Sequence, residues 1–66
     1  MKNKLKEIRE QHSLTQEQLA HKVNVSRQSI ISIEKGYYIP TTLLALKLAA
    51  TLKINTEDLF NLEKSD

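Results

Sequence analysis

The residues that most constrain the fold lie between Thr15 and Gly36, where two short helical patterns follow each other with almost no connection. The first helix is expected to begin at Thr15, because Gln18 stands three residues later and completes a capping box. The second is expected to begin at Ser26, a favourable N-cap, and to end at Gly36, a favourable C-cap. Two short helices joined by so tight a turn predict a helix-turn-helix.

One side of the second helix carries the residues expected to face a partner. A turn of 3.6 residues places Ile30 and Ile33 on an inner arc with Ser29 and Glu34. The outer arc holds both cations, an amide and no acid: Arg27, Gln28, Ile31, Ser32 and Lys35. Arg and Gln near the start of an exposed helix can read guanine and adenine edges in the major groove. The pattern predicts that this arc contacts double-stranded DNA.

A family resemblance is carried by the runs LTQEQLAHKVNVSRQSIISIEKG and IPTTLLALKLA. They resemble the Cro/C1-type (XRE family) helix-turn-helix repressors over roughly residues 4–60. The matching positions are Thr15-Gln16, Leu19-Ala20, Val25-Ser26, Ile30, Ile33-Glu34, Gly36 and Pro40. The resemblance implies an all-α, compact five-helix, lambda-repressor-like domain in which helices 2 and 3 form the helix-turn-helix. It also implies a sequence-specific regulator that binds an inverted-repeat operator as a homodimer.

The resemblance implies roles for Arg9 and Gln16. Both lie outside the reading helix, which is the second of the two helices and is expected between Ser26 and Gly36. The Arg that matches Arg9 pairs in this family with the Glu at the end of the third helix, here Glu34. Such a pair would explain a cation on the buried flank of a first helix expected over residues 3–12; the alternative is that Arg9 extends its head to solvent. The Gln that matches Gln16 contacts a DNA phosphate, a role that suits a helix N-terminus. The alternative is an ordinary exposed glutamine.

The expected DNA contacts fall into two groups. The base-reading group is Arg27, Gln28, Ile31 and Ser32, and the phosphate group is Gln16, Ser26, Lys35, Tyr38 and Thr41. Ile31 is apolar where polar residues are common in the family, so it contacts either a thymine methyl group or the edge of the core. Ser32 is short where longer amides often read a base, which leaves direct readout by Ser32 open. Of Tyr37 and Tyr38, one ring is expected to cover the core and one hydroxyl to reach a phosphate.

The rest of the chain predicts two further helices and an association surface. Thr41 is expected to cap an apolar helix that is buried almost all round, and Thr56 to cap a final helix that reaches Phe60. Phe60 and Leu62 leave an apolar terminus without an obvious partner, which predicts a homodimer surface. With the residues close to the same junctions, the expected surface is Ile39, Ile54, Phe60 and Leu62. The alternative for Leu62 is a short β pairing of the chain ends with Met1–Asn3.

Length and charge are those expected of one small DNA-binding domain over residues 1–66. Residues 1–53 carry nine Lys and Arg and four acids, whereas residues 54–66 carry one Lys and four acids. The net charges are therefore +5 and −3, so the body would face an anion and the tail would face away. No apolar run approaches a membrane span or a signal peptide, which makes the cytoplasm the expected location.

Other classes of function find little support in the residue types. There is no cysteine, and neither His12 nor His21 has a second ligand at metal-binding spacing, so neither a metal nor a cofactor is expected. The serines of the second helix lack a nearby base, which argues against an enzyme, and no small-molecule site is evident. The alternative function is an antitoxin or a protein-interaction module on the same fold.

Overall fold

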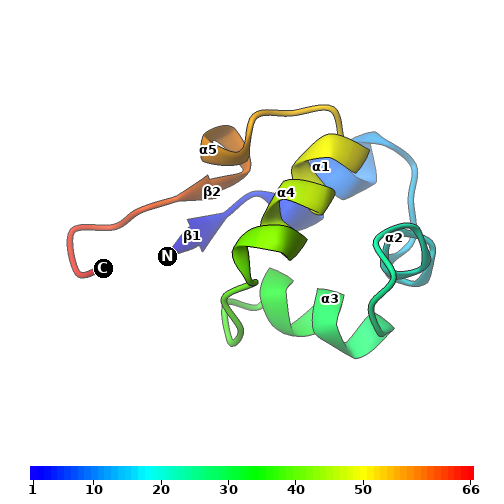
Figure 1. The fold of residues 1–66 in the computed structure, drawn as a ribbon, viewed down its shortest axis with the longest axis horizontal. Helices are drawn as coiled ribbons and strands as arrows, with labels where there is room; N and C mark the ends of the chain where they lie inside the picture. Colours follow the sequence, from blue (N-terminus) through cyan, green and yellow to red (C-terminus); the bar gives the residue numbers. More distant parts are fainter.

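Five helices surround one core, and a two-stranded sheet joins the chain ends (Figure 1). The computed structural model describes all 66 residues. The elements in chain order are β1 (Lys2–Asn3), α1 (Leu5–Gln11), α2 (Gln16–Lys22), α3 (Arg27–Glu34), α4 (Thr42–Thr51), α5 (Thr56–Leu59) and β2 (Phe60–Asn61). This order confirms the predicted five-helix fold, with α2 and α3 as the helix-turn-helix. No helix combines the length and the hydrophobicity that a membrane crossing requires.

Side-chain caps begin three of the helices where the sequence predicted them. The Thr15 hydroxyl accepts from the Gln18 amide at 3.0 Å, and the Gln18 side chain accepts from the Thr15 amide at 2.9 Å, which completes the capping box of α2. Ser26 and Thr41 accept from the third amide beyond them, at the starts of α3 and α4. The prediction that Thr56 caps the last helix is wrong. Thr56 is already the first residue of α5, and the N-cap is Asn55 without a side-chain hydrogen bond.

The first four helices end in the same turn. At the end of α3, the amides of Gly36 and Tyr37 donate to the carbonyls of Ile33 and Ser32 at 3.0 and 2.9 Å, which is a Schellman motif. The motif needs a left-handed residue, and Gly36 supplies it with φ of 79°. The helices α1, α2 and α4 end with non-glycine residues in that conformation, namely Ser13, Asn24 and Lys53.

Replacing Ser13 with Gly should stabilise the protein, because Ser13 holds φ at 56° and a Cβ atom strains that conformation by about 1 kcal/mol. We expect the free energy of unfolding in urea to rise by only part of that amount, because the greater freedom of glycine in the unfolded chain offsets the rest. Ser13→Ala is the matched control, since it removes the hydroxyl of this exposed residue but keeps the Cβ atom. Equal stabilities of the Gly and Ala variants would contradict the strain.

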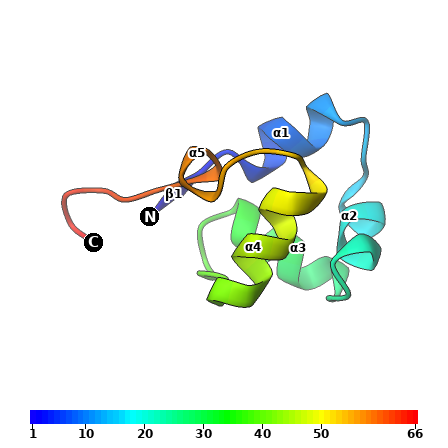
Figure 2. The ribbon, with the colours of Figure 1, turned by 45° about the horizontal axis from the view of Figure 1, so that its top comes forward.

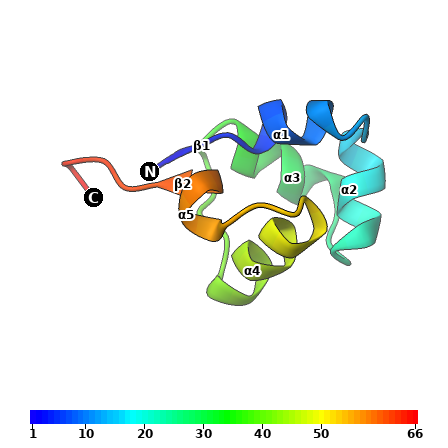
Figure 3. The ribbon, with the colours of Figure 1, turned by 90° about the horizontal axis from the view of Figure 1, so that it is seen from above.

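The core forms between the helices, and only one face of α4 contributes to it. The side chains buried completely are Leu5, Leu19, Ile30, Ile33, Leu48, Leu52 and Leu59. The prediction that α4 is buried almost all round is wrong, because Leu43 and Leu46 are 64% and 53% exposed. Figure 3 shows α4 and α1 on opposite sides of the molecule. A 66-residue domain has too few elements to surround a central helix, so the outer face of α4 stays open.

The chain ends pair in a short antiparallel sheet beside α5 (Figure 2). Lys2 lies opposite Asn61, and Asn3 lies opposite Phe60. The predicted alternative of a β pairing between the chain ends is therefore confirmed, but the partner of the first residues is not Leu62. Leu62 lies past β2 and is 84% exposed. Phe60 is only 9% exposed because its ring joins the core, so the prediction that it lacks a partner within the domain is wrong.

An ion pair also joins the two ends of the chain. The Met1 ammonium group donates to Asp66 Oδ1 at 3.0 Å and lies 3.4 Å from Glu63 Oε1. The hydrogen bond that it donates to Asp66 raises the pKa of the Met1 ammonium group, and the hydrogen bond from the backbone amide of Glu63 lowers the pKa of Asp66. Both groups are therefore charged at neutral pH.

Candidate nucleic-acid interface

The helix α3 divides into a buried face and an open face. Ile30 and Ile33 are buried completely, as predicted for residues on the inner arc of this helix. Arg27, Gln28 and Lys35 are exposed, and Ile31 and Ser32 are half-buried. Figure 1 shows α3 along the lower side of the molecule, with α1 and α4 above it. The open face therefore offers an arginine and a glutamine in the first turn of a helix that the core holds from behind.

The start of α2 lies next to the start of α3. Gln16 and Arg27 line one shallow hollow together with Arg9, Thr15 and Glu17. The structure thus brings a residue expected to bind phosphate beside a residue expected to read a base. One N–H of the Gln16 amide group donates to Glu34 Oε1 at 3.1 Å. This bond fixes the side chain and leaves its second N–H available to an anion.

The remaining candidates for phosphate contact flank α3 on both sides. Tyr38 and Thr41 line a second hollow beside the turn between α2 and α3, together with Lys47 of α4. Tyr38 is 41% exposed, whereas Tyr37 is 83% exposed, so Tyr38 is the more covered of the two rings. The hydroxyl groups of Ser26 and Thr41 accept hydrogen bonds as helix caps, and Lys35 lies exposed at the C-cap of α3.

The sequence prediction did not include Lys47 among the DNA contacts. Its only sequence signal was a cation on the otherwise apolar helix α4. That signal does not say which neighbour Lys47 faces, because the position of α4 against the turn between α2 and α3 depends on tertiary packing. The structure places the Lys47 side chain in the hollow that also holds Tyr38 and Thr41.

A buried ion pair fixes the end of α3 against α1 and α2. Arg9 Nε lies 2.6 Å from Glu34 Oε2, Arg9 Nη2 lies 3.3 Å from Glu34 Oε1, and Arg9 Nη1 donates to the Leu14 carbonyl at 2.8 Å. The two side chains are 8% and 4% exposed. The hydrogen bond with Glu34 raises the pKa of the Arg9 guanidinium. With the Gln16 amide on the same carboxylate, Glu34 joins three helices.

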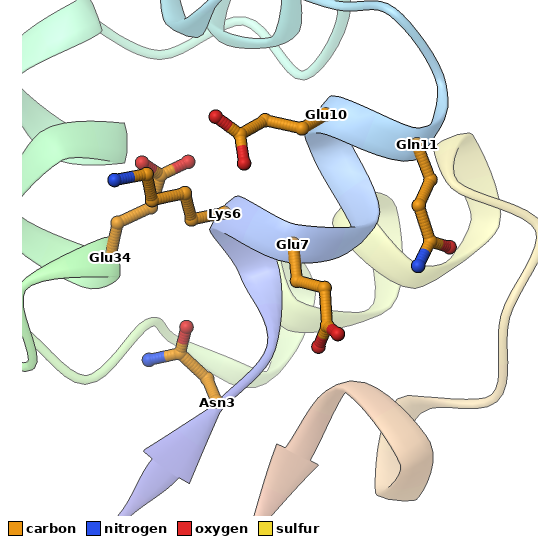
Figure 4. A pocket seen from close by; sticks show the side chains of 6 residues that line it. All are labelled: Asn3, Lys6, Glu7, Glu10, Gln11 and Glu34. Carbon is orange, nitrogen blue, oxygen red and sulfur yellow. The ribbon is translucent and has the colours of Figure 1, made fainter.

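A hollow beside α1 has the opposite character (Figure 4). Its lining is entirely polar and consists of Asn3, Lys6, Glu7, Glu10, Gln11 and Glu34. The lining carries three carboxylates and one ammonium group, so the hollow does not suit a phosphate. No group of three or more His, Cys, Asp or Glu side chains is placed to hold a metal ion.

The residues expected at a dimer surface are covered to different extents. Ile39 and Leu62 are exposed, whereas Ile54 is half-buried against the core and Phe60 is buried. Phe60 and Ile39 nevertheless share a mainly apolar groove, whose other lining residues are Met1, Pro40, Thr42, Ala45, Leu46 and Thr56. The sequence prediction did not include Leu46. An apolar helix does not show which of its leucines faces outward.

The five-helix fold and the open face of α3 are those of a DNA-binding domain of the helix-turn-helix class. The chain belongs to the helix-turn-helix family of transcriptional regulators, whose family model matches residues 5–59. It is 53% identical to an "uncharacterized HTH-type transcriptional regulator" of Methanocaldococcus jannaschii, over the full length of both chains. It is 46% identical to the HTH-type regulator YgzD of Bacillus subtilis, again over the full length of both.

Solved structures show the same architecture. The restriction-modification controller protein C.AhdI of Aeromonas hydrophila superposes with a TM-score of 0.80 and 33% identity, over 86% of each chain. The SOS-response transcriptional repressor LexA of Eubacterium rectale gives a TM-score of 0.80 and 29% identity, over 94% of this chain and 66% of that one. These similarities agree with the XRE-type resemblance and with binding to DNA.

Proposed function

We propose that this protein is a transcriptional repressor that binds an inverted-repeat DNA operator as a homodimer. The observation that carries the proposal is the division of α3, with Ile30 and Ile33 buried behind Arg27 and Gln28. A helix held in this way can enter the major groove with its first turn at the base edges. Gln16, Ser26, Lys35, Tyr38 and Thr41 would then bind the phosphates on either side.

Base reading is assigned to Arg27 and Gln28. A guanidinium group can donate two hydrogen bonds to O6 and N7 of guanine, and an amide can bond N6 and N7 of adenine. Ile31 and Ser32 are half-buried and lie farther along α3. They would lie at the margin of the contact between α3 and the bases, with Ile31 beside a thymine methyl group.

A homodimer is proposed because one reading helix contacts too few base pairs to select a site in a genome. A suitable surface is the mainly apolar groove, in which Ile39 and Leu46 are 64% and 53% exposed. Leu62, which is 84% exposed, follows two residues after Phe60 of the same groove. Figure 1 shows the loop after α3 and the terminal sheet at the end of the molecule away from α2 and the start of α3. Pairing there leaves Arg27 and Gln28 free, and two-fold symmetry implies an inverted repeat.

A repressor role is supported by one structural relative and by simple sterics. The LexA chain of Eubacterium rectale, which shares this fold, is a transcriptional repressor by its name. Occupation of a promoter by a bound dimer is sufficient to block transcription, whereas activation requires a further contact with the transcription machinery. The proposal therefore needs no surface beyond the DNA interface and the dimer interface.

Replacing Arg27 or Gln28 with Ala should weaken binding to the preferred duplex by about 1–3 kcal/mol and flatten discrimination at one position in each half-site. The measurement is fluorescence anisotropy with the preferred duplex, single-base variants of it and an unrelated duplex. Gln11→Ala is a matched control, because Gln11 is an exposed glutamine on α1. Equal losses on every duplex would make Arg27 and Gln28 phosphate contacts instead.

A further inference from the structure

Asn3 links the terminal sheet to the end of α3 through its side chain. Its backbone belongs to β1 and lies opposite Phe60 of β2. Its Nδ2 atom donates to the Ile33 carbonyl of α3 at 2.9 Å, and its Oδ1 atom accepts from the Leu5 amide at the start of α1 at 3.1 Å. Both ends of one short amide are therefore engaged, and three elements meet at it (Figure 4).

The bond to Ile33 reaches the last turn of the reading helix. The Ile33 carbonyl also accepts from the Gly36 amide at 3.0 Å, so it belongs to the turn that ends α3. Glu34 holds the same turn from another side, through Arg9 of α1 and Gln16 of α2. Of the side chains that hydrogen-bond the end of α3, only Asn3 comes from the terminal sheet.

Directional bonds matter here because the apolar packing of α3 is not directional. Ile30 and Ile33 hold the helix in the core, and because hydrophobic attraction has no preferred direction, hydrogen bonds restrict small tilts of the helix further. Arg27 lies six residues from Ile33, or about 9 Å along the helix axis. Without the bond from Asn3, α3 could pivot on its remaining anchor at Glu34, about 10 Å along the axis from Arg27. A pivot of about 10° would move Arg27 by about 1.8 Å, which is more than the whole range of good hydrogen-bond distances.

We infer that Asn3 is a positioning residue that sets the tilt of α3 relative to the terminal sheet and thereby selects the spacing between the two half-sites of the operator. The inference rests on the proposed function, in which the dimer forms beside that sheet. In such a dimer the distance between the two reading helices depends on how each α3 is held relative to the sheet. Asn3 makes that connection, so it determines specificity without touching DNA.

The variant Asn3→Asp removes the bond to α3. Aspartate keeps an oxygen that can accept from the Leu5 amide, but it loses the donor and turns a carboxylate toward the Ile33 carbonyl. Asn61→Asp is the matched control, because it makes the same exchange and the same charge change on the paired strand. The Asn61 side chain is half-exposed and lies opposite Lys2.

The measurement is the affinity of each variant for a set of duplexes that carry the two half-sites preferred by the unmodified protein, with base pairs added or removed between them. Asn3→Asp should lose about tenfold in affinity at the preferred spacing and bind the neighbouring spacings almost equally well. Its affinity for an unrelated duplex should match that of Asn61→Asp. If Asn3→Asp does not fold, Asn3→Ser, whose hydroxyl is too short to reach Ile33, should show the same flattened profile.

Two results would overturn the inference, and they are distinguishable. If Asn3→Asp or Asn3→Ser keeps the spacing profile of the unmodified protein and only melts at a lower temperature, Asn3 has a structural role alone. If the unmodified protein binds no spacing better than an unrelated duplex, the proposed function itself is wrong.

Discussion

Replacing Arg9 with Met should lower the free energy of unfolding by about 3–5 kcal/mol, because the Glu34 carboxylate would stay buried without its partner. The side chain of Glu34 is only 4% exposed, and the Gln16 amide would be the one hydrogen-bond partner left to its carboxylate. The free energy of unfolding of a small domain is about 5–15 kcal/mol, so the loss would be a large part of the total. It is the largest change in stability expected of any substitution proposed. Urea unfolding followed by circular dichroism measures it.

The double variant Arg9→Met with Glu34→Leu separates the buried charge from lost packing. It removes both members of the pair and leaves apolar side chains in their place, so most of the lost stability should return. This variant remains informative even if the single variant is largely unfolded. A double variant no more stable than Arg9→Met would contradict the role given to the uncompensated carboxylate.

Replacing Leu46 or Leu62 with Asp should convert the protein to monomers and reduce specific DNA binding to the non-specific level, a loss of about a thousandfold or more. The reason is that each substitution places a charge in the proposed apolar interface and removes the second reading helix from the complex. Sedimentation measures the association, and binding to the preferred duplex measures the consequence. Phe60 is unsuitable for this test because its ring is part of the core.

Leu43→Asp is the matched control for association. Leu43 is 64% exposed on the same helix as Leu46, but it lines the hollow with Tyr38 and Lys47 rather than the mainly apolar groove. It should therefore sediment as a dimer. Variants at Leu46 and Leu62 that stay dimeric and bind the operator normally would place the interface elsewhere.

The features that could be predicted from sequence depend on local chemistry. The starts of α2, α3 and α4 follow from side chains that cap an amide three residues away, and the two faces of α3 follow from the 3.6-residue period. The pairing of Arg9 with Glu34 spans 25 residues. It was expected only through the family resemblance.

The features that were missed depend on contacts between distant parts of the chain. Phe60 is an apolar residue near a polar terminus, and the sequence does not show that its ring joins the core. The outward position of Leu46 depends on which face of α4 meets the other helices. Asn3 contacts a carbonyl 30 residues away, and an asparagine near the N-terminus carries no signal of such a contact.

The central claim is that α3 reads DNA as one of two symmetric copies, and selection of bound duplexes from a random-sequence pool tests it most directly. The account predicts that the enriched duplexes carry inverted repeats whose half-site centres lie about 10–10.5 base pairs apart, one turn of DNA. It also predicts that Arg27→Ala changes the enriched bases within each half-site and leaves the symmetry intact. Enrichment of a single unrepeated motif, or of no motif, would contradict the account.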